Sequence, residues 1–202
     1  MDISVTYHRE WGAGWIAPEP AAMRRASHAL SHDGGVWLVD PVDGDGLDEL
    51  IAPLGEVRGV IQLLDRHNRD CAALALRHGV PHLATPFDRV AGAPFEPVTV
   101  VRWSGWRETA MWLPEHRALV VAEALGTSPY YPVPGEALGV HPALRLTPPR
   151  ALWPYSPRHL LPCHGEPVEG DDLGDRIRAA IDRSRRDIPR WLVGVARNLR
   201  RP

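Results

Sequence analysis

The stretch Val57–Asp70, which reads VRGVIQLLDRHNRD, decides the fold. Its first part, residues 57–64, is a nearly continuous apolar run, which is typical of a strand buried on both faces. The run ends in a polar loop, and Cys71–His78 then predict a helix that ends at Gly79. A buried strand that passes through a polar loop into a helix indicates a layered α/β protein, in which sites form at strand ends.

Shorter apolar segments on both sides of this stretch predict further strands. Upstream, Ala26–Ser31 and Val36–Val39 flank His32-Asp33-Gly34-Gly35, a turn of the hairpin type. Downstream, the predicted strands are Pro97–Trp103, Glu108–Leu113 and Ala118–Val121. A short helix is expected at Leu47–Ile51. Strands before, between and after helices favour an α/β fold in which helices cover sheets.

The composition excludes several classes of protein. The chain has 202 residues, of which 44% are hydrophobic and 24% charged, as in soluble globular proteins. The net charge of −2 favours neither a nucleic acid nor a membrane as partner. All 23 basic residues are Arg, which excludes Schiff-base, pyridoxal-phosphate and P-loop chemistry. The first residues do not resemble a signal peptide, so a cytoplasmic location is expected.

We expect a single domain over residues 1–202, with a basic helical C-terminal segment at 171–202. That segment carries nine Arg against five Asp, and its apolar residues recur at helical spacing. Between Pro129 and Pro157 the chain is rich in Pro and aromatic residues, which predicts a long connecting loop.

Residues able to bind a metal or transfer a proton follow three of the predicted strands. Asp65, His67 and Asp70 lie in the loop after the buried run. Glu123 follows the strand that ends at Val121, and His164 follows a short apolar segment near the C-terminus. Because sites of layered α/β proteins form at strand ends, these side chains are predicted to converge.

The order of these segments resembles that of the metallo-β-lactamase superfamily of hydrolases. Val36–Pro41 resembles an early strand that ends in a structural aspartate, here Asp40, and Val60–Asp70 stands where the family carries its His-x-His-x-Asp-His loop. Glu108–Leu125 resembles the strand pair that ends in the family's bridging aspartate, and Leu161–Gly165 resembles its Pro-Gly-His-Gly turn. The resemblance implies an αββα sandwich of four layers, two sheets face to face with helices outside.

The sequence departs from the family pattern at the metal loop. The family's four ligand positions there are occupied by Asp65, His67, Arg69 and Asp70, and a guanidinium cannot bind a metal. No His stands near Trp103–Trp106, where the family has another ligand. We therefore predict at most one metal ion, because the positive charge of Arg69 would repel a second.

Two interpretations of the altered site remain open. In the first, one zinc, iron or manganese ion is bound by Asp65, His67, Asp70, Glu123 and His164, or by most of them. The resemblance then implies hydrolysis of an ester, thioester or lactone by metal-activated water, with Asp65 and Asp70 as the catalytic carboxylates.

In the second interpretation no metal is bound, and the protein is a non-catalytic binding or scaffold protein. Arg69 would then replace the charge of the metal by pairing with Asp70 or Glu123. Both interpretations expect a small-molecule substrate or ligand, and neither predicts an oligomeric state.

Two further groups of residues are assigned structural roles. Asp43, Asp45 and Asp48 resemble a calcium loop, but Leu47 stands where a ligand would be needed, so an acidic turn before a helix is expected. The histidines without a partner pattern are interpreted as surface or structural residues: His28, His32, His78, His82, His116, His141 and His159.

Overall fold

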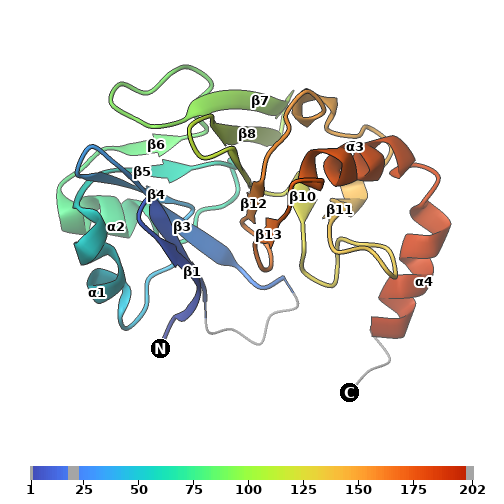
Figure 1. Cartoon of the computed structure of the whole chain (residues 1–202), viewed down its shortest axis with the longest axis horizontal. Helices are drawn as coiled ribbons and strands as arrows, with labels where there is room; N and C mark the ends of the chain where they lie inside the picture. Colours follow the sequence, from blue (N-terminus) through green and yellow to red (C-terminus); the bar gives the residue numbers. More distant parts are fainter. Residues whose placement is uncertain (1, 18–22, 199–202) are drawn as a thin grey trace.

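The computed structural model describes residues 2–17 and 23–198, and two β-sheets facing one another form its centre (Figure 1). The first sheet has the order β1–β2–β3–β4–β5–β6, with strands Ser4–Arg9, Gly12–Ile16, Ala26–His32, Gly35–Val39, Glu56–Gln62 and His82–Ala84. The second has the order β13–β12–β9–β8–β7, where β7 is Glu96–Trp103, β8 Trp106–Leu113, β9 Ala118–Val121, β12 His159–Pro162 and β13 Val168–Glu169. β10 (Leu125–Gly126) and β11 (Gly139–Val140) form a separate ribbon.

The strands that the sequence predicts are present within a residue or two. β3 and β4 pair as an antiparallel hairpin, and Asp33 and Gly34 at its tip have φ values of 48° and 71°. Positive φ at both central residues defines the turn type that matches the twist of a hairpin. β5 lies parallel to β4, and β12 lies parallel to β9. The carboxyl ends of the strands in each parallel pair therefore lie side by side.

Alternation along the strands sorts the buried side chains between the layers. In β4, Trp37 and Val39 belong to the core between the two sheets, whereas Val36 and Leu38 belong to a second core on the opposite face. In β9, Val120 lies in the core between the sheets. Each sheet is thus apolar on both faces and needs cover on its outer side.

Helices supply that cover. α1 (Leu47–Ile51) and α2 (Cys71–His78) pack Leu47 and Leu74 onto the outer face of the first sheet. α3 (Leu173–Arg183) places Ile177 and Ile181 on the outer face of the second sheet, and α4 (Ile188–Asn198) follows it. The result is the αββα sandwich of four layers that the resemblance implied. None of the described helices is long and apolar enough to cross a membrane.

The Pro-rich segment 129–157 is less uniform than the predicted loop. It contains β11 and two short 3₁₀ turns, Pro142–Leu144 and Arg150–Leu152. A third 3₁₀ turn, Ala52–Leu54, follows α1. β11 pairs with β10, which directly follows Glu123 and Ala124. This pairing places the segment beside the carboxyl end of β9.

Candidate metal centre

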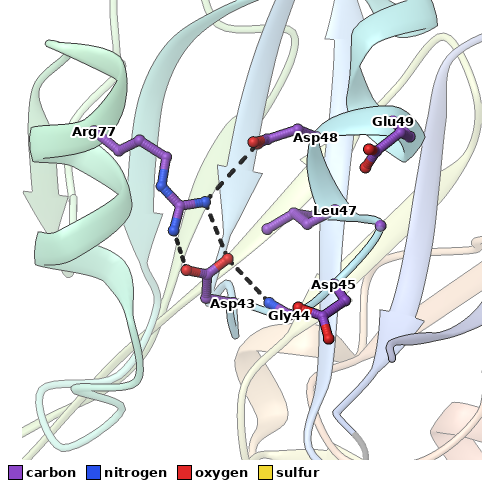
Figure 2. Close-up of a pocket in the computed structure, with 8 residues that line it drawn as sticks. Asp43, Gly44, Asp45, Leu47, Asp48, Glu49 and Arg77 are labelled. Carbon is purple, nitrogen blue, oxygen red and sulfur yellow. Dashed lines mark hydrogen bonds and ion pairs between the residues drawn. The ribbon is translucent and has the colours of Figure 1, made fainter. Parts of the chain in front are cut away.

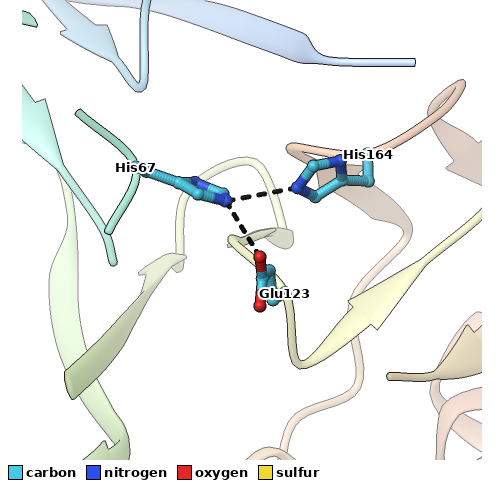
Figure 3. A group of neighbouring side chains, drawn as sticks. All are labelled: His67, Glu123 and His164. Atoms are coloured by element: carbon cyan, nitrogen blue, oxygen red, sulfur yellow. Dashed lines mark hydrogen bonds and ion pairs between the residues drawn. The ribbon is translucent and has the colours of Figure 1, made fainter. Parts of the chain in front are cut away.

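Three of the predicted site residues lie together although they are far apart in the sequence. His67 comes from the loop after β5, Glu123 from the end of β9, and His164 from the end of β12 (Figure 3). Each offers a ligand atom, and these atoms lie within 4.8 Å of one another. The described part of the chain contains no other group of three such residues. The predicted convergence of strand ends from both sheets is therefore confirmed for these three side chains.

The distances within the cluster match those between ligands of one metal ion. Nε2 of His67 lies 3.2 Å from Nε2 of His164 and 3.5 Å from Oε1 of Glu123. In a tetrahedral zinc site with bonds of ~2.0–2.1 Å, neighbouring ligand atoms lie about 3.3 Å apart. The donor set of two imidazole nitrogens and one carboxylate oxygen suits zinc and also iron and manganese.

Both imidazoles are oriented by hydrogen bonds at their other nitrogen. Nδ1 of His67 lies 2.9 Å from Oδ2 of Asp40, and Nδ1 of His164 lies 3.1 Å from the carbonyl oxygen of Met23. Both partners accept, so each Nδ1 carries the proton and donates it. In the neutral rings the lone pair is then on Nε2, and the two lone pairs face one another and Glu123. Three acceptors that converge in this way require a cation or a shared proton between them.

Charges around the cluster show where that proton would reside. Burial disfavours a charge on His67, but Asp40 and Glu123 outweigh burial and raise its pKa above the usual value. Burial, with Arg69 and His67 nearby, lowers the pKa of His164 to about 3. Burial also works against ionisation of Glu123, yet the bonds from His67 and Arg66 lower its pKa to about 2. Without a metal, these shifts favour His67 as the group that takes up the proton, between the carboxylates of Asp40 and Glu123.

Asp40 connects the end of β4 to the ring of His67. It follows β4 with a φ of 42°, and its side chain is fully buried. Oδ1 accepts from the backbone N–H of Leu63, while Oδ2 accepts from His67. A carboxylate held in this way fixes the ring of a metal-binding histidine.

Arg66, rather than Arg69, is the cation of the site. Its Nη2 lies 2.6 Å from Oε2 of Glu123, and its guanidinium lies 4.0 Å above the centre of the Trp106 ring. Nη1 donates to the carbonyl oxygen of Gly105. Arg66 thus binds the oxygen of Glu123 that a second metal ion would need. The sequence analysis had assigned this blocking role to Arg69.

The predicted pairing of Arg69 with Asp70 or Glu123 is wrong. Its guanidinium donates instead to three backbone carbonyls, those of Ala26, Asp40 and Cys163. These carbonyls follow or begin strands of both sheets, so Arg69 joins the sheets beneath the site. Arg66 and Arg69 are three positions apart in the same loop, yet only Arg66 contacts Glu123.

Asp65 and Asp70 do not join the cluster, which corrects their placement as ligands. Asp65 contacts the backbone of Arg107 in β8: its N–H donates to the Arg107 carbonyl oxygen, and its Oδ2 accepts from the Arg107 N–H at 3.0 Å. Asp70 is the N-cap residue directly before α2, and its Oδ2 accepts from the backbone N–H of Asp43. Asp65 faces β8 because its backbone continues the pairing with that strand. Asp70 faces the loop before α1 because it lies at the start of α2.

Two residues near the cluster were not expected. His141, interpreted from the sequence as surface or structural, places Nε2 3.7 Å from Oε2 of Glu123. Its Nδ1 accepts from the N–H of Ala143, so Nε2 carries the proton and points it toward the carboxylate. Only the pairing of β11 with β10 brings His141 here, and no local pattern in the sequence indicates it.

Glu108 is the second unexpected residue. It is fully buried, and its Oε1 accepts from the N–H groups of Glu123 and Ala124 while Oε2 accepts from the indole of Trp106. Burial raises the pKa of Glu108 to about 7. Glu108 therefore holds the turn that presents Glu123. The sequence gives little signal for this role, because Glu108 stands between two other polar residues, Arg107 and Thr109.

The acidic turn before α1 carries its own counter-ion. Figure 2 shows Arg77 of α2 paired with Asp43 and Asp48. These three residues line a pocket of about 580 Å³. The bond to Arg77 lowers the pKa of Asp43. The expected structural role of this turn agrees with these contacts.

Comparison with solved structures identifies the fold. The metallo-β-lactamase FIM-1 from Pseudomonas aeruginosa, in its mono-zinc form, superposes with a TM-score of 0.60 at 10% identity, over 92% of this chain and 97% of that one. A similar enzyme from Erythrobacter litoralis, also in a mono-zinc form, gives a TM-score of 0.60 at 13% identity, over 89% and 96% of the two chains. The metallo-β-lactamase from Pontibacter korlensis gives 0.58 at 11% identity, over 90% and 99%.

The chain therefore has the metallo-β-lactamase fold over nearly its whole length. No family model matches the sequence, and no curated protein does either. At such low identity the likeness concerns the fold, and chemistry has to be argued from the site itself.

Proposed function

We propose that the protein binds one divalent metal ion through His67, Glu123 and His164 and uses it to hydrolyse a small ester, thioester or lactone. The observation that carries the proposal is the approach of two oriented Nε2 atoms to 3.2 Å beside an ionised carboxylate. Two of the solved structures with this fold are described as mono-zinc forms, which supports a site for a single ion.

A bound ion would act as a Lewis acid that polarises a substrate carbonyl and lowers the pKa of a water molecule. The chain supplies the conditions for this chemistry. Asp40 and the Met23 carbonyl keep the Nε2 atoms of both histidines available, and His141 points an N–H group at Glu123. Three protein ligands are the usual number in catalytic zinc sites, which leave a position for water or substrate.

The ion pair between Arg66 and Glu123 supports one ion rather than two. A second ion would have to displace a guanidinium that also stacks on Trp106 and donates to Gly105. The positive charge of Arg66 would in addition repel it.

Metal analysis of tag-free protein tests the proposal most directly. We expect one zinc, iron or manganese ion per chain, and one zinc site in calorimetric titration of the chelator-treated protein. His164→Ala removes a ligand and should abolish this binding, whereas His32→Ala at the end of β3 should leave it unchanged. Wild-type protein that binds no divalent ion would overturn the metal site.

Hydrolysis is tested separately on a panel of small esters, thioesters and lactones. The expected result is turnover that chelator removes, that zinc restores, and that His164→Ala lacks. Metal binding without turnover of any panel member would limit the proposal to a metal-binding protein.

A metal-free ligand-binding protein is the competing function, and one observation favours it. Arg66 is paired with Glu123, and His67 lies between Asp40 and Glu123, so a protonated His67 together with Arg66 would neutralise both carboxylates without a metal. If the wild type binds no metal while folding normally, this function replaces the first.

A further inference from the structure

We propose that a second cleft, beside Phe87, binds the phosphoryl group of a small organic phosphate. The cleft has a volume of about 600 Å³ and lies between the segment after β6 and the strands β7 and β8. Thr85, Phe87, Thr99, Arg102 and Arg107 are among the residues that line it. None of the three metal-site residues does.

Two arginines without a counter-ion converge in this cleft. Arg102 of β7 and Arg107 of β8 are direct cross-strand partners, and like charges in that position repel one another. Their guanidinium carbons lie 5.0 and 5.2 Å from the centre of the Phe87 ring. Within residues 2–17 and 23–198, neither guanidinium forms an ion pair or a hydrogen bond. The ring attracts both cations through its π face but carries no net charge to neutralise them.

A β-bulge brings a hydroxyl group to the same face of the sheet. The pairing of β7 with β8 shifts between Thr99 and Val101, so Val100 is an extra residue. Regular alternation would place residues 99 and 102 on opposite faces, but Thr99 and Arg102 are both exposed and both line the cleft. The bulge thus aligns a hydroxyl donor with the arginine pair.

The opposite wall of the cleft contains a strained residue. Thr85 has a φ of 45°, which is unfavourable for a β-branched side chain, and its N–H is held by the carbonyl of Gln62 at 2.7 Å. Strain of this kind is concentrated at ligand clamps and other functional positions. Here it presents Thr85, a buried residue, to the cleft.

The charges in the cleft favour a phosphate over a carboxylate. Arg89 also lines the cleft but is paired with Glu96, and Asp88 lies outside ion-pair distance of every arginine there. The guanidinium groups of Arg102 and Arg107 and the hydroxyl groups of two threonines could donate hydrogen bonds to the oxygens of a phosphate monoester. The two positive charges would balance its double negative charge. A carboxylate carries a single charge and two acceptor oxygens, whereas a phosphate monoester carries about two charges and three terminal oxygens. The Phe87 ring would pack against the organic part of the ligand.

Calorimetric titration of the full chain with phenyl phosphate tests the proposal. We expect binding by the wild type and by Arg158→Gln, a matched control whose guanidinium lies outside the cleft and is paired with Asp171. The double variant Arg102→Gln/Arg107→Gln should bind at least about tenfold more weakly, because both charge-assisted contacts are lost. Equal binding by the double variant and the wild type, or no binding by the wild type, would overturn the site.

Two further ligands separate the chemistry of the occupant. Benzoate should bind much more weakly than phenyl phosphate, and equal affinity would overturn the preference for a phosphoryl group. Inorganic phosphate should also bind more weakly, since it cannot contact Phe87. Equal affinity for the inorganic ion would overturn the organic phosphate as the ligand.

Thermal melts distinguish a binding role of the arginines from a structural one. Without phosphate, Arg102→Gln should melt no lower than the wild type, because the loss of its exposed contact with the Phe87 ring is offset by removal of the repulsion from Arg107. A clearly lower melting temperature would show that the arginine pair stabilises the fold and would contradict the proposal.

Discussion

Asp40 controls which nitrogen of His67 faces the candidate metal site. We predict that Asp40→Asn weakens zinc binding by about 10- to 100-fold, the usual effect of losing a carboxylate behind a ligating histidine. The amide preserves the size of the side chain but removes the charge that holds the Nδ1 proton of His67. Calorimetric titration of zinc measures the effect. Asp43→Asn, which alters an aspartate paired with Arg77, is the control and should bind zinc as the wild type does. Equal loss in both variants would contradict a specific role for Asp40.

Arg66 competes with a metal ion for Glu123. We predict that Arg66→Met strengthens zinc binding by roughly tenfold, because it frees Oε2 of Glu123 and removes a positive charge beside the site. The methionine still covers Trp106 with an apolar chain. Zinc affinity by calorimetry checks this, with melting temperature as a measure of intact folding. Weaker zinc binding by a well-folded Arg66→Met would mean that the ion pair supports the site rather than competing with it.

At the scale of elements, Arg69 joins strands of the two sheets. It donates to carbonyls of β3, of the residue after β4 and of the residue after β12. We predict that Arg69→Met lowers the free energy of unfolding by on the order of 3 kcal/mol, since several charge-assisted hydrogen bonds are lost. Urea denaturation measures the loss. Arg66→Met is the matched control and should cost far less. Similar unfolding curves for Arg69→Met and the wild type would show that water replaces these bonds.

His28 forms a second link between the sheets and makes stability depend on pH. It is fully buried on β3, where Nε2 donates to the carbonyl of Pro162 on β12 and Nδ1 accepts from Tyr7. Burial lowers its pKa to about 4, so it stays neutral in the folded protein while it takes up a proton in the unfolded chain below about 6.5. The unfolded state then binds more protons, and stability falls as pH drops from 6.5 toward 4.

We predict that this histidine alone removes on the order of 3 kcal/mol over that interval. His28→Gln cannot titrate and should show a flatter decline of unfolding free energy between pH 6.5 and 4. Urea denaturation of both proteins in chelator, so that metal binding does not contribute, gives the comparison. Parallel curves would indicate that His28 is protonated without cost in the folded state.

Local patterns explain why much of this architecture was predictable. The hairpin of β3 and β4 and the helix α2 depend on turn residues and apolar periodicity within a few positions, so their bounds match closely. The convergence of His67, Glu123 and His164 was also predictable, because each of them follows the end of a predicted strand. Within the loop after β5, however, successive side chains point in different directions, and the sequence does not show which of them face the site. Only the fold decides that Arg66 reaches Glu123 while Arg69 turns beneath it.

At the scale of the whole molecule, the candidate metal site lies between the two sheets and takes residues from both. His67 follows a strand of the first sheet, and Glu123 and His164 follow strands of the second. An ion bound by all three would therefore connect the two halves of the sandwich. Unfolding separates these ligands, so binding free energy adds to the stability of the folded state.

We predict that zinc at a free concentration 100-fold above its Kd stabilises the protein by about 2.7 kcal/mol, which raises the melting temperature by roughly 5–10 °C. The gain should shrink at acidic pH, because Asp40 and Glu123 raise the pKa of His67 and zinc must displace its proton. Thermal melts at several zinc concentrations and pH values measure both effects. His164→Ala should show no zinc-dependent rise, and His32→Ala should show the full one. A rise that persists in His164→Ala would place the ion elsewhere, and a rise that grows as pH falls would contradict competition between zinc and the proton on His67.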